Sequence, residues 1–531
     1  MSMKAILAAC SLGLSATLAS PMTAQQAEPT NIRSIDKAGK VITVLSPLRV
    51  DERIVTNELV TPLSFNDSDY ELISNADRVH ILDFPIDRHL TIDLELETFD
   101  VVAPNATRVA GTPEGSVPAP TGDITLLRGE ITGIPDSWVY LAISPRMNNG
   151  IIDIQGTSYV LSSGSAQNMN SPVIYNMSDL PDGEIDWVEF ACTAIAPPGV
   201  SLMGDGGEEG DGSNPFDQPC RIVNVAIEGD NELADRFGTA DPDAALELTN
   251  MYIESLVGGV SQIYTRTWNM QLRIVYTRVF AGGEVANPDP WEGNSTPGAL
   301  TELRELWTSS DIPYAGNQSP ALPNWHGVHL LSARPLGGGI AYLNAICNPD
   351  IAMAVSANLN GAFPNPLVNN DPQNWDLVVT AHEWGHNFGA PHTHGLSPVV
   401  DACGFGDCSL AEFGTIMSYC HTCPGGLANI ELTFAERILG EGIIQYVATL
   451  IPDEDCAILD LSPDGCTGDP NNPNDCPGDL NGDGVLNGAD FTAWIIAYND
   501  GDLSADLNGN GTLEPGDFTA WLIAFQNGCE E

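Results

Sequence analysis

Three histidines in the last third of the chain have the residue type and the spacing of metal ligands. His382 and His386 are four residues apart, Glu383 directly follows the first, and the segment HEWGHNFGAPH ends at His392. On a helix, residues four apart lie on the same face, so both imidazoles can reach one ion. Glu383 is rotated by about 100° from that face and can reach a metal-bound water instead. We expect Gly389 to end the helix in a left-handed conformation, after which the chain turns and brings the third histidine to the metal.

These residue types predict a zinc site with hydrolytic chemistry. Three protein ligands leave a fourth position open, as in catalytic rather than structural zinc sites. Bound zinc lowers the pKa of its water to about 7, and Glu383 would accept a proton from that water and pass it to a departing amine. The pattern therefore predicts peptide-bond hydrolysis with one Zn²⁺ as cofactor and Glu383 as general base.

The whole stretch resembles the metzincin clan of zinc peptidases, and His386-Asn387-Phe388-Gly389 is most similar to its adamalysin, or reprolysin, branch. In that family the methionine of a tight turn lies beneath the zinc, and this role is implied for Met417 in the segment GTIMSY. Residues 339–347 resemble the edge strand and nearby cysteine that precede the active-site helix. The resemblance implies that a protein or peptide substrate lies extended along Ile340 to Asn344, pairing backbone to backbone.

Two positions depart from the adamalysin pattern. Thr393 and His394 stand where that branch usually places an aspartate after the third ligand, and His394 is a rival ligand whose spacing does not fit the motif. Tyr419, two residues after the methionine, is more like the tyrosine of astacins and serralysins, which can approach the zinc or the oxyanion. A purely structural tyrosine is the other interpretation, and both stay open.

The cysteines near the site form two groups, and each group has two interpretations. Four cysteines surround the methionine turn: Cys403, Cys408, Cys420 and Cys423. In an exported chain they favour disulfides, with a structural zinc site as the alternative. In metzincins a propeptide cysteine can occupy the open zinc position and keep the enzyme latent, and the resemblance implies this role for Cys192. A disulfide from Cys192 to Cys220 is the alternative.

A duplicated acidic pattern near the C-terminus predicts two Ca²⁺ sites. Each copy has oxygen-bearing side chains at positions 1, 3, 5, 9 and 12 of a loop, a glycine at position 6, and a backbone carbonyl ligand at position 7. The predicted ligands are Asp479, Asn481, Asp483, Val485, Asn487 and Asp490 in the first loop, and Asp506, Asn508, Asn510, Thr512, Glu514 and Asp517 in the second. Two such loops without an entering helix resemble dockerin type I modules. This implies a cohesin-like or cell-surface partner, and a simple stabilising role is equally open.

Composition limits the class of protein and its location. The 531 residues include 71 acidic and 19 basic ones, for a formal net charge of −52, which would repel nucleic acid and anionic membranes. Lys4 and the apolar run from Ala5 to Ala19 have the layout of a secretory signal peptide. A lipoprotein cleavage box at Cys10 is the alternative, although it sits too early in the run. No later segment approaches the roughly 20 apolar residues of a membrane span.

The patterns along the chain predict several domains. We expect a β-rich N-terminal propeptide, an α/β (α+β) metzincin catalytic domain with a mixed twisted sheet and an active-site helix, and a small α-helical calcium-loop module. Helical spacing occurs at 244–268, 376–388 and 433–450, and strand patterns at 221–228 and 272–280. The predicted units are residues 1–24 (signal peptide), 25–203 (β-rich propeptide-like domain), 204–216 (acidic glycine-rich linker), 217–452 (catalytic domain), 453–477 (linker) and 478–531 (calcium-binding repeat pair).

Together these patterns predict a secreted, extracellular metalloendopeptidase, with attachment to a cell surface as an option. The alternative from another class is a catalytically silent adhesin or scaffold component that keeps the metzincin fold for binding. Glu383 argues against that alternative, because pure binding needs no general base.

Overall fold

The computed structural model describes most of the chain between residues 41 and 450 and part of its C-terminus. The described ranges are 41–164, 171–181, 184–185, 192–196, 220–308, 325–367, 375–450, 459–462 and 488–500, without residues 55, 57, 114 and 284, and with the single residues 505, 518, 521 and 525. The predicted signal peptide, the linker 204–216 and every predicted calcium ligand except Asp490 lie outside them. Among these residues no helix has the length and apolar character to cross a membrane.

The N-terminal part forms a large, mainly antiparallel sheet, as the alternation of apolar and polar residues predicts. Ten described strands pair in the order β1-β4-β5-β8-β9-β10-β11-β12-β3-β2, with α1 (Asp67–Ile73) packed beside β1. The strands are β1 (Val41–Leu45), β2 (Leu48–Val50), β3 (Val60–Phe65), β4 (Arg78–Pro85), β5 (Thr91–Thr98), β8 (Thr125–Ile131), β9 (Ser137–Ile143), β10 (Asn148–Ile154), β11 (Thr157–Ser162) and β12 (Val173–Asn176).

A second, mixed sheet is the centre of the region predicted to be the catalytic domain. Its described strands follow the order β13-β17-β18-β16-β14-β15-β6-β7, and β21 pairs with one end of β14. The strands are β6 (Val102–Thr112), β7 (Gly115–Pro118), β13 (Thr193–Ile195), β14 (Cys220–Gly229), β15 (Met270–Val279), β16 (Gly327–Leu331), β17 (Gly339–Tyr342), β18 (Met353–Ser356) and β21 (Leu459–Ser462). A small separate pair consists of β19 (Gly414–Thr415) and β20 (Ile430–Glu431).

Helices α3 (Pro242–Trp268), α4 (Thr296–Thr308) and α5 (Asp376–Asn387) pack against this mixed sheet. The other described helices are α2 (Asn231–Asp235), which packs against α3, α6 (Glu436–Ile438), α7 (Ile444–Leu450), and α8 (Gly488–Asp500) in the C-terminal module. The helix predicted at 433–450 is interrupted, because a π-helical turn at Leu439–Ile443 separates α6 from α7. Gly442 in this turn packs against the chain just after α5, where an added Cβ would lie 2.7 Å from the Gly389 carbonyl oxygen.

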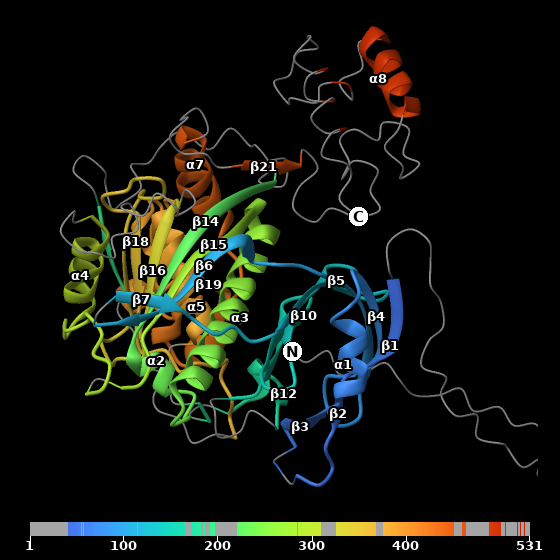
Figure 1. Ribbon diagram of the computed structural model, residues 1–531, viewed down its shortest axis with the longest axis horizontal. Helices are drawn as coiled ribbons and strands as arrows, with labels where there is room; N and C mark the ends of the chain where they lie inside the picture. Colours follow the sequence, from blue (N-terminus) through green and yellow to red (C-terminus); the bar gives the residue numbers. More distant parts are fainter. Residues whose placement is uncertain are drawn as a thin grey trace, which may run out of the picture.

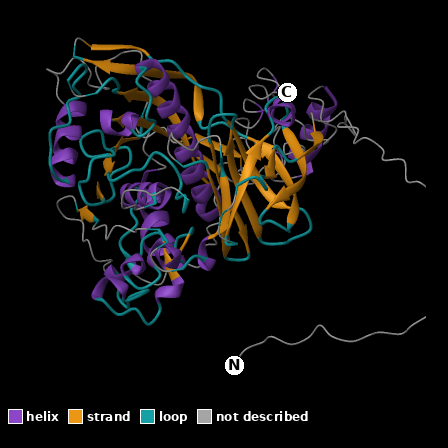
Figure 2. Ribbon diagram, turned by 90° about the horizontal axis from the view of Figure 1, so that it is seen from below, coloured by secondary structure: helices purple, strands orange, loops and turns teal. Residues whose placement is uncertain are grey.

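The long helix α3 lies between the two sheets (Figures 1 and 2). Asp241 caps its first turn by accepting a hydrogen bond from the Asp243 N–H, and a left-handed Asn269 ends it. Close packing against β9 depends on Gly258, since a Cβ there would lie 2.6 Å from the hydroxyl of Tyr140. All seven residues of β9 are buried, because its two faces point into two different cores, one of which contains α3.

Two segments of the predicted propeptide-like domain join this mixed sheet. The β6–β7 hairpin extends the sheet beyond β15, and β13 pairs with β17 at the opposite end. Neither pairing could be predicted from the sequence, because strand patterns carry no information about which distant strand becomes the partner. Four residues of the predicted linker 453–477 form β21 and pair with the first residues of β14.

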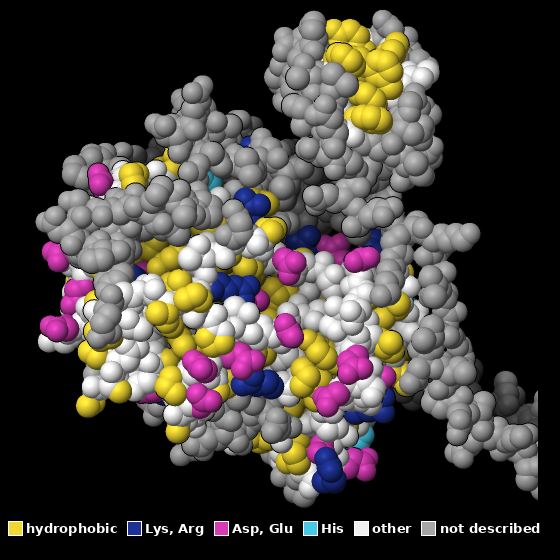
Figure 3. All heavy atoms as spheres, in the orientation of Figure 1, with side chains coloured by type: hydrophobic (Ala, Val, Ile, Leu, Met, Phe, Trp, Pro, Cys, Tyr) yellow, Lys and Arg dark blue, Asp and Glu magenta, His cyan; other side chains and the backbone are white. Residues whose placement is uncertain are grey.

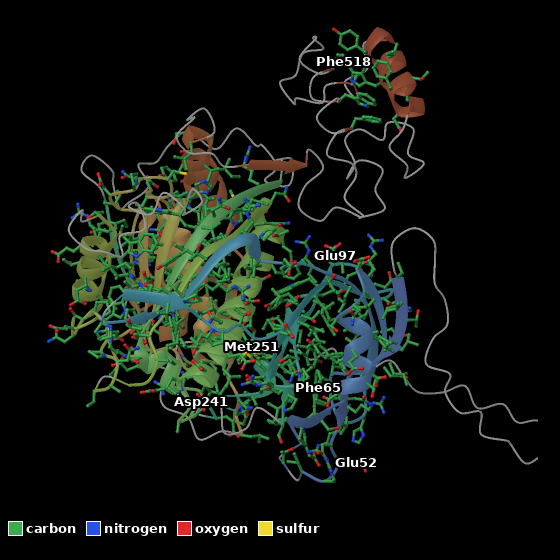
Figure 4. All side chains as sticks on the ribbon, in the orientation of Figure 1. Glu52, Phe65, Glu97, Asp241, Met251 and Phe518 are labelled. Carbon is green, nitrogen blue, oxygen red and sulfur yellow. A yellow bond between two sulfur atoms is a disulfide. The ribbon has the colours of Figure 1, made fainter. Side chains whose placement is uncertain are left out.

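In the C-terminal module, equivalent aromatic residues of the two predicted repeats pack together. Trp494 of α8 and Trp521 are buried in one small cluster, and the rings of Phe491 and Trp521 are 4.9 Å apart between centroids. The Trp494 indole N–H donates to the Ala505 carbonyl at 3.0 Å, and Phe518 is labelled beside this cluster in Figure 4. Asp490 is fully buried near the start of α8.

Acidic side chains are spread over the described surface on the face that Figure 3 shows, with fewer basic ones among them. This distribution agrees with the strongly negative formal charge of the chain.

Candidate active site

The helix α5, which carries two of the candidate ligands, is anchored at its first residue. The buried Asp376 carboxylate accepts hydrogen bonds from the Tyr252 hydroxyl of α3 and from the backbone N–H groups of Asn360 and Gly361, the latter two at 3.0 Å. Burial raises the pKa of Asp376 to about 6, although these hydrogen bonds act in the opposite direction. The start of α5 is therefore held against both α3 and the loop that follows β18.

The end of α5 turns the chain back toward the site. Gly389 has a φ of +99°, the left-handed conformation that its place in the motif predicts. The Ala390 N–H donates to the Gly385 carbonyl at 2.8 Å, which closes the last turn. His392 follows in an extended conformation and approaches the two histidines of α5.

Backbone carbonyls orient the two imidazoles of α5. His382 Nδ1 is 2.6 Å from the Ile416 carbonyl oxygen, and His386 Nδ1 is 2.7 Å from that of Ala390. A carbonyl can only accept, so each Nδ1 carries the proton and each Nε2 keeps its lone pair for a metal. Burial lowers the pKa of both rings, to about 4 for His386, so they are neutral near pH 7 as metal ligands must be.

The third histidine and one cysteine complete a four-atom donor set. One donor atom each from Cys192, His382, His386 and His392 lies within 4.8 Å of all the others. His386 Nε2 is 3.2 Å from His392 Nε2 and 3.2 Å from Cys192 Sγ. Tetrahedral zinc would separate two nitrogen ligands by about 3.3 Å and a nitrogen from a sulfur by about 3.6 Å. Three nitrogens and one sulfur in this arrangement fit Zn²⁺.

The Cys192 thiol and the Glu383 carboxyl, two acidic groups beside the histidines, also fit a site for a cation. Burial is the largest cause of the raised pKa of both the Cys192 thiol and the Glu383 carboxyl. Their proximity adds to the effect on the thiol, because Sγ lies 3.4 Å from Oε2 of Glu383. A divalent cation among the four donors would supply the compensating charge and favour the thiolate.

Glu383 lies against the strand predicted to bind substrate. It is fully buried, and its carboxylate packs over Gly339 at the start of β17. A Cβ on Gly339 would lie 2.1 Å from Glu383 Oε1 and 2.4 Å from its carboxyl carbon. Only glycine fits here. Gly339 was not predicted as a functional residue, and the run of three glycines before Ile340 is the only signal for it in the sequence.

The strand β13 pairs with the edge of β17, in the position where a substrate is expected to bind. Thr193 to Ile195 pair in parallel with Ile340 to Tyr342, and the Leu343 N–H donates to the Ile195 carbonyl at 2.9 Å. The Tyr419 hydroxyl donates to the Cys192 carbonyl at 2.6 Å. The segment that brings Cys192 to the histidines is thus held by strand pairing on one side and by Tyr419 on the other.

Comparison with known proteins shows what this part of the chain is similar to. Residues 220–430 match Reprolysin_5, a model of metallopeptidase family M12. The matched M12 region contains His382, Glu383, His386 and His392, and it excludes Cys192 and the β6–β7 hairpin. Its mixed, sheet-rich fold is consistent with that of a metalloprotease. Among solved structures, the chain is similar to one described as the crystal structure of metalloproteinase-II from Bacteroides fragilis, with 9% identity, a TM-score of 0.31, and coverage of 59% of this chain and 81% of that chain. No curated protein matches.

Met417, within the matched residues 220–430, is fully buried and lies against α5. An added Cβ on Gly385 would lie 2.9 Å from the Met417 sulfur, so the methionine can approach α5 because Gly385 has no side chain. The Thr393 N–H donates to the Met417 carbonyl at 3.2 Å, which links the methionine turn to the residue after His392.

His394 and the four nearby cysteines support the walls of the site. The His394 ring stacks on His392 with an angle of 8° and 5.1 Å between centroids, and it is not part of the four-atom donor set. Cys403 is bonded to Cys420, and Cys408 to Cys423, which confirms the prediction of disulfides in place of a structural zinc site. Cys192 is a free, buried thiol, so the alternative disulfide to Cys220 is not formed.

Proposed function

We propose that this protein is a secreted, zinc-dependent endopeptidase that is made as a latent precursor. The observation that carries the proposal is the convergence of three imidazole nitrogens and one carboxylate beside a strand that can pair with an extended peptide. The M12 family match supports a metallopeptidase, and the proposed zinc ligands are His382, His386 and His392.

When bound, Zn²⁺ would polarise the substrate carbonyl and lower the pKa of a coordinated water. Glu383 is proposed to accept a proton at its carboxylate and to deliver it to the departing amine. The backbone of β17 would hold the substrate in an extended conformation, and Met417 would form the apolar floor below the ligands. Tyr419, once free of the Cys192 carbonyl, is proposed to donate a hydrogen bond to the developing oxyanion.

Latency is proposed to come from Cys192. Its sulfur lies in the donor set together with the three imidazoles, so as a thiolate it would fill the fourth zinc position that a catalytic site leaves open. The pairing of β13 with β17 would at the same time exclude substrate. Cleavage of the chain beyond β13 would allow both obstacles to be removed.

The test compares the processed protein with its Glu383→Ala variant for zinc content and for proteolysis of casein, with and without a chelator. We expect the wild type to bind about one zinc per chain and to lose activity with the metal. The variant should keep zinc and lose activity by at least about 100-fold. Activity retained in the variant would refute the role of Glu383, and zinc binding without proteolysis in either protein would favour the adhesin or scaffold alternative.

The C-terminal module is proposed to bind two Ca²⁺ ions and to attach the enzyme to a cohesin-like or cell-surface partner. The duplicated ligand pattern supports the calcium sites, and the packing of Trp494 with Trp521 supports a paired arrangement of the repeats. Calcium binding by the full chain should fall from two ions to none in the variant with Asp479→Ala and Asp506→Ala. Unchanged binding would exclude both loops.

A further inference from the structure

Both outer positions of the catalytic sheet are taken by strands from the N-terminal half of the chain. The order β13-β17-β18-β16-β14-β15-β6-β7 places β13 at one end and the β6–β7 hairpin at the other. These two additions differ in size. The strand β13 contributes three residues, whereas β6 contributes eleven and carries β7 on its outer side. The N-terminal half therefore pairs with β17 over a short strand and with β15 over a long one.

The hairpin is built into the sheet by backbone pairing and by apolar contacts. Residues of β6 pair in parallel with β15 from Ile274 to Val279, and the Ile274 N–H donates to the Val101 carbonyl at 2.6 Å. Val101 and Ala110 are buried. Gly111 packs directly under the Phe280 ring, where an added Cβ would lie 2.3 Å from ring carbons. Figure 1 shows the hairpin beside β15, with the chain entering it from the N-terminal sheet and returning to that sheet.

Polar contacts tie the same hairpin to the helix and loops of the M12 region. Arg108 of β6 forms an ion pair with Glu254 of α3 at 2.7 Å, and both side chains are mostly buried. The Asn287 side-chain amide donates to the Gly111 carbonyl at 2.9 Å. Just beyond β7, the Asn250 amide donates to the Pro120 carbonyl at 3.0 Å. Removing the hairpin would leave the edge of β15 and these groups without their partners.

The N-terminal sheet itself packs on α3 over a continuous core. The Tyr140 hydroxyl donates to the Ser255 carbonyl at 2.5 Å, and the Arg266 guanidinium lies 4.4 Å from the centroid of the Trp138 ring. Met251 of α3, labelled in Figure 4, packs closely against Gly122, which follows the hairpin. One apolar core cluster includes side chains from both β9 and α3.

We propose that the N-terminal domain stays bound to the catalytic domain as a non-covalent subunit after the chain is cut beyond β13. The β6–β7 hairpin on β15 is the element that retains it. The segment with Cys192 becomes a loose end that can leave β17 while the rest of the domain remains. This retention requires no peptidase activity, so a failure of the proposed function would not affect it.

The first experiment cuts the chain at one engineered place. A recognition sequence for a site-specific protease is inserted between residues 204 and 212 of the full chain, in the Glu383→Gln background so that self-digestion is avoided. After cleavage, we expect both fragments to elute together in size-exclusion chromatography at about 1 µM and to separate only in denaturant. An N-terminal fragment that elutes alone under native conditions would overturn the proposal.

A matched pair of hairpin variants identifies the retaining element. Gly111→Val places a side chain into the Phe280 ring, whereas Val117→Ala removes atoms from a half-exposed side chain on the neighbouring strand. We expect the cut Gly111→Val protein to release its N-terminal fragment at least ten times faster than the cut parent, and the cut Val117→Ala protein to match the parent. Equal release rates in both variants would overturn the role of the hairpin.

Hydrogen exchange then distinguishes the two ends of the sheet. In the cut protein with Cys192→Ala, where no thiol can hold β13, the Leu343 amide should exchange at least ten times faster than before the cut. The Ile274 amide should keep its protection within about threefold. Loss of protection at Ile274 would show that the hairpin leaves, and equal protection at both amides would contradict the loose end at β13.

Discussion

Replacing Gly339 with alanine would place a methyl group against the carboxylate of Glu383. The added carbon would lie 2.1 Å from Oε1, 2.4 Å from the carboxyl carbon and 2.5 Å from Cγ. An ordinary contact needs at least 3.4 Å, so the carboxylate has to move by more than 1 Å. His382 and His386 are held by α5 and by backbone carbonyls, and the three atoms nearest to the added carbon all belong to Glu383 and not to a histidine.

The expected loss follows from that displacement. A misplacement of about 1 Å in a reacting group costs about 100-fold in rate, and the complete loss of a general base costs between about 100-fold and about 10,000-fold. We therefore expect kcat/KM of the processed Gly339→Ala enzyme to fall by about 100-fold, which corresponds to about 2.7 kcal/mol of transition-state stabilisation. Zinc content should stay at the wild-type value.

The assay measures kcat/KM on casein-type substrates together with zinc content and thermal unfolding. Gly440→Ala is the matched control, because an added Cβ at that position has no neighbour within 4 Å. The control should keep activity within about twofold of the wild type. Near wild-type activity in Gly339→Ala would refute the assignment of the buried Glu383 position as the catalytic one, and loss of zinc would show that the effect reaches the ligands instead.

Three further predictions concern latency, pH and the disulfides. The intact Cys192→Ala precursor should cleave casein without prior processing. If it is as latent as the wild-type precursor, the proposal that the thiol fills the fourth zinc position is refuted. Burial raises the pKa of Glu254 from 4.5 to about 7, with the Arg108 charge acting in the opposite direction. The folded state therefore keeps a proton that the unfolded chain releases, and up to about 3 kcal/mol of stability is lost as the pH rises from about 4.5 through about 7. Denaturant unfolding across this range should show a smaller decline for Glu254→Gln, and identical slopes would contradict the shift. Removing the Cys408–Cys423 bond, which spans 15 residues, by alanine substitution of both cysteines should cost about 3 kcal/mol, measured by denaturant unfolding against the wild type with its disulfides intact.

Much of the site could be predicted because its residues are close together in the chain. His382, Glu383 and His386 share two helical turns, so their relative directions follow from helix geometry alone. Gly389 and His392 come within the next six residues, and the left-handed glycine is where the motif predicts it. The paired disulfides could be predicted as a class from four cysteines in a chain whose N-terminal pattern predicts export, although their connectivity could not.

Tertiary structure decided every relation between distant segments. Cys192 reaches the histidines across about 190 residues, Gly339 meets Glu383 from another strand, and β6 chooses β15 as its neighbour. Local patterns state that a segment is a strand and which face is apolar, but they do not state its partner, because many strands offer equivalent backbone donors and acceptors. The sequence by itself determined the chemistry of the candidate ligands and the helix that carries two of them. Only long-range packing decided that β13 pairs with β17 and that the N-terminal half of the chain shares the mixed sheet with residues 220–430.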